Sequence, residues 1–405
     1  MKGGFFFPES EIVGSVEGCF TCKLYRGCIS PKMEPTGEGK RGLLIIAEAP
    51  GRREDEKGTQ LIGQSGQVLR SKLSDLGIDL DKDCRKIDAI SCRPPDNRMP
   101  TGEEIAACRS RVWKEIREYK PKVILLLGGP ALESFLAHRW PEALEGIGKW
   151  RGWAIPDRDS GAWVVPTFHP SFIDRGSSPP VAEVIWERDL KLAISLLGTP
   201  FPQFKDEREC VEVISEEGEL SQVLESIYKK VRKDRMLTAL DYETTGLKPY
   251  AEGHRVVSAS ISAEENKAYS FLFPDPFSPA FSWWYKILQC KDIPKTAYNM
   301  KFEDTWSRVK LNIEVKGWEW CSMQGAHVLD NRPGINGLDF QMYVRFGLLP
   351  WDGVVGGFLK SKDKKDGNSF NNIDKAPVRE LLKYGGIDAL GQRRLAIIQR
   401  AEAGL

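Results

Sequence analysis

Apolar and polar positions follow two patterns along the first half of the chain. Short apolar runs, of the length of buried strands, are separated by longer stretches in which apolar residues recur at helical spacing. This order of strands and helices predicts a parallel sheet covered on both faces, with functional groups at the carboxyl ends of the strands. The expected strands are 43–47, 87–90, 123–127 and 163–168, and the expected helices are 66–76, 103–119, 130–137 and 181–197.

The second half begins with an amphipathic helix, which closely spaced strands follow. Apolar residues recur at i, i+3, i+4, i+7 and i+11 from Leu220 to Val231, which predicts one buried helix face. The segment 360–372 is polar and rich in lysine, so we expect a flexible loop there. Strands are expected at 237–241, 256–261 and 268–273, as an antiparallel meander, with a further strand at 295–298 and a terminal helix at 378–400.

The length of 405 residues exceeds one ordinary domain of ~100–200 residues. A Gly-Thr-Pro-Phe-Pro stretch at 198–202, followed by charged residues, predicts a linker. We therefore expect two α/β domains, 1–198 and 208–405, joined by a linker at 199–207. The first is predicted to be a three-layer α/β/α domain, and the second to contain a mixed sheet.

Composition narrows the class of protein. Hydrophobic residues make up 41% and charged residues 28%, which indicates a globular chain. Lys and Arg number 58 and Asp and Glu 57, so any DNA contact must come from local patches, and an acidic site would need a cation. No apolar run reaches the ~18 residues of a membrane span, so we expect no membrane partner and a cytoplasmic protein, in the host cytoplasm if a phage encodes it.

Acidic residues in the second half lie where they can converge. Asp241 and Glu243 close an expected strand and face the same side, while Glu303, Asp304 and Asp388 lie in helix-like segments. Any one of these acids alone would be an ordinary surface charge. Converging acids repel one another unless cations neutralise them, and two Mg²⁺ or Mn²⁺ ions ~4 Å apart would also clamp the reacting oxygens of a phosphodiester.

Three motifs around these acids occur in a familiar order. They are Asp-Tyr-Glu-Thr-Thr-Gly-Leu at 241–247, Asn-Met-Lys-Phe-Glu at 299–303 and Tyr-Gly-Gly-Ile-Asp at 384–388, with a further similar segment at 327–338. Residues 208–405 thereby resemble the DEDDy-type proofreading 3′–5′ exonuclease domain of family A DNA polymerases, which has an RNase H-like fold. The resemblance implies that Asp241, Glu243 and Asp388 bind metal. It also implies that Tyr384 orients the attacking water and that Leu247 wedges against the terminal base of the DNA.

The middle motif departs from the family pattern. The family usually has Asp where this chain has Glu303, and Asp304 follows immediately. Glutamate keeps the charge and adds one methylene, so the register favours Glu303 as the metal ligand. Asp304 would serve instead if the helix began one residue differently.

Nine cysteines in a cytoplasmic chain indicate metal ligation or burial rather than disulfides. Cys19, Cys22, Cys92 and Cys108 form a set whose spacing fits either zinc or an iron–sulfur cluster, and the other five are expected to be packing residues. Motifs at 47–51, 58–66, 92–95 and 169–171 make residues 10–198 similar to a family 4 uracil-DNA glycosylase. That resemblance implies a [4Fe–4S] cluster on these four cysteines.

The same resemblance implies a pocket that receives a flipped uracil. His169 would stabilise the negative charge on uracil O2, and Glu48 would position water or stabilise the sugar cation. The pocket departs from the family in two places: Leu61 replaces a stacking Phe, and Asp88 replaces an Asn that reads uracil. An ionised Asp only accepts hydrogen bonds, whereas a protonated one would match cytosine. We therefore expect weak or absent uracil excision and a surviving DNA-binding role.

The sequence as a whole predicts a DNA replication or repair protein with two activities in one chain. Family A polymerase motifs are missing, and the arrangement resembles bacteriophage replication proteins, in which a separate DNA polymerase subunit could supply synthesis. The expected substrate is DNA, as single strands or 3′ ends. Two alternatives stay open: a non-catalytic DNA-binding subunit of a polymerase complex, and an active uracil-repair enzyme that tolerates Asp88 and Leu61.

Overall fold

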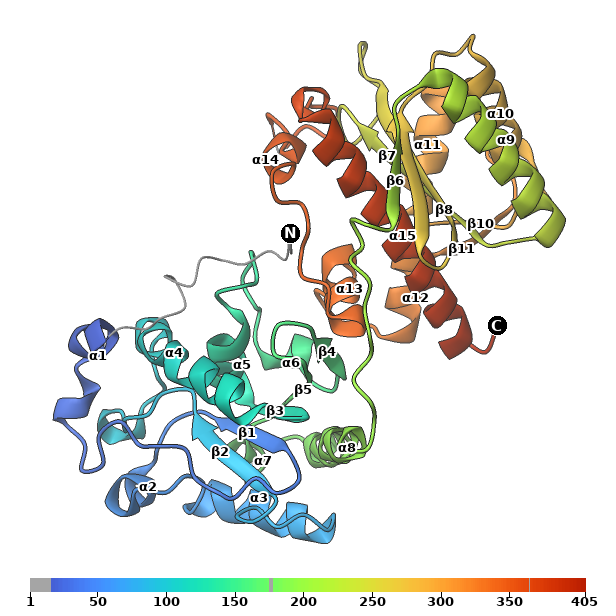
Figure 1. The fold of residues 1–405 in the computed structure, drawn as a ribbon. Helices are drawn as coiled ribbons and strands as arrows, with labels where there is room; N and C mark the ends of the chain where they lie inside the picture. Colours follow the sequence, from blue (N-terminus) through green and yellow to red (C-terminus); the bar gives the residue numbers. More distant parts are fainter. Residues whose placement is uncertain (1–15, 175–177, 364) are drawn as a thin grey trace. The chain divides into compact units, whose positions relative to one another are not determined.

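The computed structural model describes residues 16–174, 178–363 and 365–405, and its polypeptide forms two compact units (Figure 1). The first unit extends to Pro202 and also includes Tyr343–Leu349. The second unit consists of Gln203–Met342 and Pro350–Leu405. Each unit contains one β-sheet. Two α/β domains, the second with a mixed sheet, were predicted, and this fold class is confirmed.

The sheet of the first unit has the strand order β2-β1-β3-β5-β4. Four strands are parallel, and only β4 runs antiparallel to its neighbour. Every residue of β1 and β3 is buried, as expected for central strands covered on both faces. The sequence did not predict β4, which has three residues and therefore too little pattern to recognise. The strands are β1 (Leu43–Ala47), β2 (Cys84–Asp88), β3 (Val123–Leu127), β4 (Ile155–Asp157) and β5 (Ala162–Thr167).

Helices of the first unit cover this sheet. Helix α4 begins with a capping box, in which the Thr101 hydroxyl accepts from the Glu104 backbone N–H and the Glu104 carboxylate accepts from that of Thr101. The helices are α1 (Val16–Cys22), α2 (Arg52–Lys57), α3 (Gln64–Asp75), α4 (Gly102–Tyr119), α5 (Gly128–Leu136), α6 (Ile147–Trp150), α7 (Pro170–Asp174) and α8 (Pro180–Leu196), with 3₁₀ turns at Leu24–Arg26 and Pro95–Asn97.

The segment Tyr343–Leu349 belongs to the first unit, and Tyr343, Val344 and Gly347 are buried in it. The Tyr343 hydroxyl donates to Asp157 Oδ2 at 2.7 Å, and Arg139 Nη1 donates to the same oxygen at 2.9 Å. Arg139 and Asp157 are both almost fully buried, so each charge depends on the other for its neutralisation.

The sheet of the second unit has the order β11-β10-β7-β8-β9-β6. Strands β7, β8 and β9 form the predicted antiparallel meander, and β6, β10 and β11 run parallel to their neighbours, which makes the sheet mixed. The short strands β6 and β11 were not predicted. The strands are β6 (Val211–Ile214), β7 (Thr238–Thr244), β8 (Val256–Glu264), β9 (Lys267–Leu272), β10 (Lys295–Ala297) and β11 (Trp318–Cys321).

Helix α15 lies along one face of this sheet, and α9 and α10 lie on the other (Figure 1). The alternation of β7 sends Leu240 and Tyr242 into the apolar core beneath α9 and α10. Asp241 and Glu243 therefore face α15. The helices are α9 (Glu217–Asp234), α10 (Pro279–Gln289), α11 (Met300–Leu311), α12 (Ser322–Leu329), α14 (Gly356–Leu359) and α15 (Val378–Glu402), with a 3₁₀ turn at Ile373–Lys375, and α13 (Leu338–Phe346) continues past Met342.

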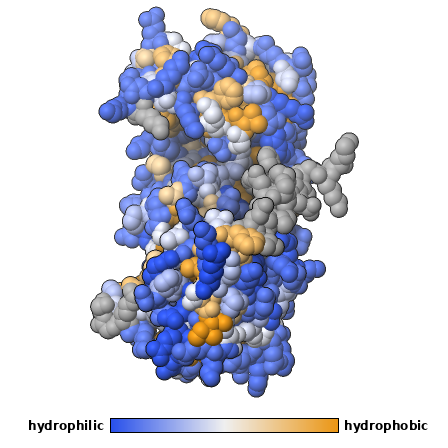
Figure 2. Space-filling view, turned by 90° about the vertical axis from the view of Figure 1, so that its left-hand side faces the viewer, coloured by the Kyte–Doolittle hydropathy of each residue, from blue (hydrophilic) through white to orange (hydrophobic). Residues whose placement is uncertain are grey.

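Neither the described helices nor the surface drawn in Figure 2 present a long apolar stretch. No helix in the described part of the chain is long and apolar enough to cross a bilayer. The face drawn in Figure 2 is mostly hydrophilic, with hydrophobic residues in a few small patches. Scattered apolar side chains of this kind are ordinary on protein surfaces.

Candidate active sites

Three carboxylates converge between β7 and α15. Asp241 and Glu243 project from the strand and Asp388 from the helix, and one oxygen from each lies within 4.8 Å of the others. Helix α15 approaches this closely because it has no side chain at Gly385. A Cβ atom there would lie 3.1 Å from Ser260 Oγ and 3.6 Å from Asp241 Oδ2. The adjacent Gly386 is packed more tightly still, because a Cβ atom there would lie 2.3 Å from Val211 Cγ1. Both glycines of the third motif thus allow α15 to pack closely on the sheet.

Glu303 supplies a fourth carboxyl to the same region, and Asp304 does not. Glu303 is buried in the first turn of α11, and its Oε2 atom has no hydrogen-bond partner among the described residues. Asp304 instead pairs with Arg308 at 2.6 Å and accepts from Trp318 Nε1 at 3.3 Å. The register of α11 therefore turns Glu303, not Asp304, toward Asp241.

The electrostatics of this site favour protons or a cation. Burial raises the pKa of Asp241 to about 7. Burial and the neighbouring carboxylates raise the pKa of Glu243 and of Asp388 well above the ordinary values. Burial and Asp241 likewise raise the pKa of Glu303. Buried carboxyls this close together cannot all be ionised without a counter-charge, and their oxygens are the ligands that Mg²⁺ prefers.

Tyr384 and Leu247 border the acids. Tyr384 lies one helical turn before Asp388 on α15, and burial, followed by Asp388, raises the pKa of its hydroxyl, which therefore keeps its proton as a donor. Leu247 follows β7 and is 69% exposed. An exposed leucine beside a polar site is available for contact with a substrate.

Sequence reasoning missed two residues of this site. Trp351 Nε1 donates to Asp388 Oδ1 at 2.8 Å, which fixes the orientation of that carboxylate. The charge of Asp339 adds to the factors that raise the pKa of Asp388. Asp339 directly follows the motif-like segment 327–338, so its position offered a signal, whereas nothing in the sequence around Trp351 indicated its partner.

In the first unit, predicted site residues lie at the carboxyl ends of neighbouring parallel strands. Glu48 follows β1, and Asp88 ends β2 opposite Ala47. His169 follows β5, and at the end of β3 Gly128 adopts a φ of +86° against it. A Cβ atom on Gly128 would lie 3.0 Å from His169 Cβ, so the glycine permits this contact. The structure thus brings Glu48, Asp88 and His169 to one edge of the sheet.

Asp88 is 4% exposed, and its Oδ2 atom has no hydrogen-bond partner in the described part of the chain. Burial, then Glu54 and Glu48, raise the pKa of Asp88 well above its ordinary value. The raised pKa favours the neutral acid, which presents one O–H donor and one C=O acceptor.

His169 and Leu61 differ in what they offer to a base. The Ser171 backbone N–H donates to His169 Nδ1 at 3.2 Å, so a neutral ring carries its proton on Nε2. Leu61 is buried in the apolar core of the unit, with a φ of +55°. Leu61 thus supplies neither an aromatic face nor an exposed one.

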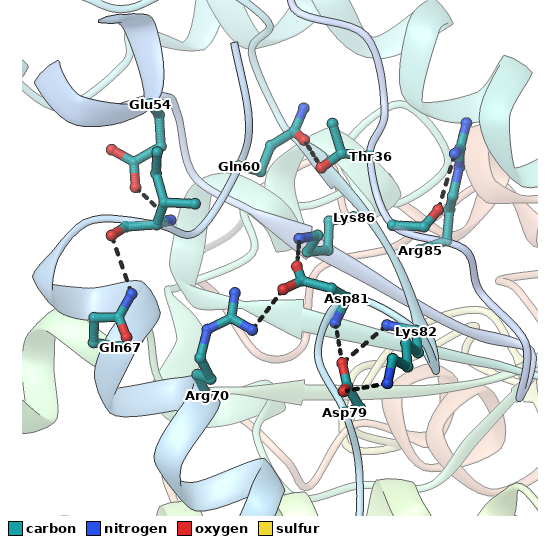
Figure 3. Close-up of polar contacts among 12 residues, drawn as sticks. Thr36, Glu54, Gln60, Gln67, Arg70, Asp79, Asp81, Lys82, Arg85 and Lys86 are labelled. Carbon is teal, nitrogen blue, oxygen red and sulfur yellow. Dashed lines mark hydrogen bonds and ion pairs between the residues drawn. The ribbon is translucent and has the colours of Figure 1, made fainter. Parts of the chain in front are cut away.

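The loop that contains Leu61 is held by side chains on both sides (Figure 3). Glu54 accepts from the backbone N–H groups of Ile62 at 3.0 Å and Gly63 at 2.6 Å. Gln60 accepts from the Thr36 hydroxyl and donates to the Glu34 carbonyl. Glu54, which sequence analysis did not single out, thereby fixes the loop and also perturbs Asp88.

Four cysteines line one small cavity in the first unit. Cys19 and Cys22 lie on α1, Cys108 lies on α4, and Cys92 lies in the loop after β2. Helices α1 and α4 approach closely, since a Cβ atom on Gly18 would lie 2.7 Å from the Ala107 carbonyl oxygen. Burial raises the pKa of Cys92 to about 12 and that of Cys108 to about 11. A fifth cysteine, Cys28, packs against the cluster that contains Cys92 and Cys108, and its thiol donates to the Tyr25 carbonyl at 3.8 Å.

Comparison with known proteins covers both units. The model of the uracil DNA glycosylase superfamily matches residues 35–190. The type-4 uracil-DNA glycosylase of Thermotoga maritima is 34% identical over 190 residues, which are 46% of this chain and 94% of that protein. A DNA polymerase of Bacillus phage SP01 is 24% identical over 374 residues, 86% of this chain and 38% of the polymerase. This match spans both units.

Among solved structures, Escherichia coli RNase D, an exoribonuclease, is similar with a TM-score of 0.33 and 12% identity, over 48% of this chain and 45% of that protein. The family of the first unit follows from the sequence match, because the chain covers 94% of the glycosylase of Thermotoga maritima at 34% identity. The predicted resemblance of this region is confirmed, and through its first unit the chain belongs to the uracil DNA glycosylase superfamily.

Proposed function

We propose that the second unit is a metal-dependent 3′–5′ exonuclease that degrades DNA from single strands or 3′ ends. The proposal rests on the convergence of Asp241, Glu243 and Asp388, with the buried Glu303 beside them. Acids on a strand and two helices meet although burial and repulsion oppose their ionisation. Burying these carboxyls together destabilises the folded state, and a bound cation would offset that destabilisation.

Each residue of this site would have a distinct role in the hydrolysis of the phosphodiester. Asp241, Glu243, Glu303 and Asp388 would hold two Mg²⁺ or Mn²⁺ ions, which stabilise the attacking and leaving oxygens of the phosphodiester. Tyr384 would orient the attacking water through its protonated hydroxyl, and Leu247 would contact the terminal base. Similarity to a phage DNA polymerase supports DNA as the substrate and a DNA polymerase subunit as the partner.

A second candidate function belongs to the first unit, where Glu48, Asp88 and His169 share one sheet edge. Here we propose a DNA-binding base pocket with weak uracil excision. His169 Nε2–H would donate to uracil O2, and Glu48 would position water or stabilise the sugar cation. The neutral Asp88 can pair with uracil or, with donor and acceptor exchanged, with cytosine, so it discriminates less than an amide. Leu61 provides no stacking face.

The cysteine cavity fits the [4Fe–4S] cluster of the proposal. Four thiols from α1, α4 and the loop after β2 surround one space, and cluster assembly would replace their protons. The cluster would cross-link α1 to two later elements. It would therefore contribute to the folding of the first unit.

The exonuclease proposal predicts separate effects for neighbouring acids. Asp241→Ala and Glu303→Gln should each lower digestion of a 5′-labelled single strand in Mn²⁺ by roughly 10²-fold or more, because electrostatic stabilisation of the transition state is lost. Asp304→Asn, the matched control, should stay within a few-fold of the parent. Digestion at the parent rate by Asp241→Ala would mean that these acids do not form the active site. No digestion by the parent itself would leave the alternative of a non-catalytic DNA-binding subunit.

Metal binding should be visible as a pH-dependent change in melting temperature. The folded-state pKa of Asp241 is about 7 against an ordinary 3.8, so without metal the folded state binds the extra proton between these values. This stabilisation is complete below about pH 4 and is lost as the pH rises through about 7. Mn²⁺ should therefore raise the melting temperature of the second unit more at pH 8 than at pH 5.5.

Asp241→Asn provides the control for this measurement. It should raise the metal-free melting temperature at pH 8, because a buried charge is removed, and it should diminish the shift that Mn²⁺ causes. An equal Mn²⁺ shift in the parent and in Asp241→Asn would contradict metal ligation by Asp241.

The cluster proposal predicts a brown protein with about four irons per chain when it is purified anaerobically. Cys108→Ser should lose iron and lower the melting temperature of the first unit, because a cross-link between helices is removed. Cys84→Ser, a buried cysteine outside the cavity, is the matched control and should keep its iron. Stoichiometric zinc without iron in the parent would refute the cluster.

The altered pocket predicts poor uracil excision by the parent protein. Stacking on an aromatic ring contributes ~1–3 kcal/mol per base. The lack of a stacking ring at Leu61 alone could therefore lower the rate of uracil excision roughly tenfold or more. Asp88→Asn combined with Leu61→Phe should raise the rate of uracil release from a uracil-containing strand, and His169→Ala added to that pair should lower it again. Efficient release by the unmodified protein that His169→Ala abolishes would contradict this account of the pocket.

A further inference from the structure

The lysine-rich segment 360–372, here called the lysine loop, is docked on the end of the strand that bears Asp241 and Glu243. The Asn371 backbone N–H donates to the Thr245 carbonyl at 3.0 Å, and its side-chain amide donates to the Thr244 carbonyl at 2.9 Å. Phe370 forms an isolated antiparallel bridge with Gly246. The loop thus continues the hydrogen bonding of the sheet beyond β7, next to the acidic site.

His254 holds the lysine loop in this position. Its ring is 4% exposed and stacks on Phe370 with a centroid distance of 3.9 Å and an interplanar angle of 17°. His254 Nε2 lies 2.8 Å from the Asn368 carbonyl oxygen, and Nδ1 lies 3.0 Å from Thr245 Oγ1. Because a carbonyl only accepts, Nε2 carries the proton, and the Thr245 hydroxyl donates to Nδ1.

Gly246 of the first motif makes this contact possible. A Cβ atom at Gly246 would lie 2.5 Å from His254 Cε1 and 2.8 Å from the Ser369 carbonyl oxygen. The glycine therefore serves the docking of His254 and the loop against the strand end. Any larger residue would push both away.

The two ends of the lysine loop are anchored beside Tyr384. Phe358 and Leu359, before the loop, and Ile373, after it, belong to one apolar cluster that also includes Tyr384 and Leu381 of α15. The loop is therefore fixed to the strand that bears two acids and to the helix that bears the third.

The docked loop presents positive charge to solvent. Lys360, Lys362 and Lys365 are exposed. The loop has four lysines and two acids, so its formal charge is +2. The two acids are exposed as well and shape the loop: Asp363 Oδ1 accepts from the Lys365 backbone N–H and Asp366 Oδ1 from that of Asn368, both at 2.9 Å. These bonds shape the loop and leave its lysine side chains directed to the surface.

Two exposed apolar side chains flank, in sequence, a lysine that lies close to the loop. Leu247 is 69% exposed and Tyr250 is 64% exposed, both directly after β7. The exposed Lys248 lies between them in sequence, and its Cε would be 3.2 Å from a Cβ atom on Gly367 of the loop. Exposed lysines on the loop, together with an exposed aromatic ring and a leucine on the segment that carries Lys248, match a strand with a phosphate backbone and unpaired bases.

We propose that the lysine loop binds the phosphates of single-stranded DNA upstream of the terminal nucleotide, that Tyr250 stacks on a base, and that His254 positions the loop. The inference rests on the proposed exonuclease function and names the part of the unit that holds the strand. The lysine loop is fixed by a buried histidine, by two hydrogen bonds from Asn371 to backbone carbonyls, and by an apolar cluster. A loop that is already docked loses less entropy when it binds DNA, and this proposed role explains why a polar loop is held in place.

The test reverses two charges in the full chain. Lys362→Glu with Lys365→Glu is compared with Lys233→Glu and Lys291→Glu, two exposed lysines that precede β7 and β10 at the opposite ends of those strands. Affinity for a fluorescent oligothymidylate is measured by anisotropy in EDTA. The loop variant should bind roughly tenfold more weakly, and its slope of log affinity against log salt should fall by about 1.4, or ~0.7 for each single-strand phosphate contact.

Catalysis supplies a second measurement. The ratio of kcat/KM for the oligonucleotide to that for thymidine 5′-p-nitrophenyl phosphate, which has no upstream phosphates, should fall roughly tenfold in the loop variant and stay constant in the control. Anisotropy in EDTA measures binding without hydrolysis. If the parent proved inactive, the exonuclease proposal would be refuted, but the binding measurement would still test whether the lysine loop binds DNA. Equal affinity and equal salt slopes in loop and control variants would overturn the proposal, even in an active enzyme.

The role of His254 is tested by His254→Phe, which keeps a ring against Phe370 and removes both hydrogen bonds. Trypsin should then cleave within the lysine loop faster, and the KM for the oligonucleotide should rise more than kcat falls. Tyr250→Phe, which keeps an aromatic face, should bind like the parent, whereas Tyr250→Ala should bind more weakly. Unchanged cleavage and KM in His254→Phe would refute the positioning role, and equal binding by Tyr250→Ala would refute stacking.

Discussion

Repulsion among buried carboxyls is the constraint on which the second unit depends. Asp241, Glu243, Glu303 and Asp388 lie together where burial makes ionisation costly, and the first three each raise the pKa of a neighbouring carboxyl. The surrounding structure must therefore hold them in place against their own charge. The alternation of β7, the absent side chain at Gly385 and the indole N–H of Trp351 on Asp388 do so from three directions.

The same arrangement explains why the loops around this site are well anchored. At the end of β7, where Thr244 still pairs with Val256 of β8, the carbonyls of Thr244 and Thr245 accept hydrogen bonds from the lysine loop. Asn371 satisfies both, and His254 fills the space beside Gly246. Substrate-contacting groups such as Leu247 can then stand exposed on a backbone that is fixed a few residues away. Rigid support and an exposed contact surface are thereby combined in one segment.

The sequence predicted elements and contacts correctly where a pattern of residues fits only one kind of structure. Continuous apolar runs predicted β1 and β3, helical spacing predicted α9, and the motifs predicted that Asp241, Glu243 and Asp388 converge. It failed where an element is short or a contact is distant in sequence. Strands β4, β6 and β11 are too short for a periodic signal. Trp351, 37 residues from its partner, contacts Asp388 only because the chain folds back, and no local pattern records that.

Asp88 and Asp241 show that one physical effect has two functional outcomes. Burial raises the pKa of both carboxyls, and in both cases an oxygen lacks a hydrogen-bond partner among the described residues. Around Asp241 further carboxyl oxygens lie within 4.8 Å. A divalent cation can therefore displace the protons, and its charge offsets the energetic cost of burying several carboxylates. Asp88 ends its strand in a different setting: Glu54, which also raises its pKa, is engaged by two backbone N–H groups of the loop around Leu61. There the less costly state is the neutral acid, and a neutral acid is a hydrogen-bonding group with both a donor and an acceptor. In the functions that we propose, the number of carboxyl oxygens within reach would separate a metal ligand, Asp241, from a group suited to reading a base, Asp88.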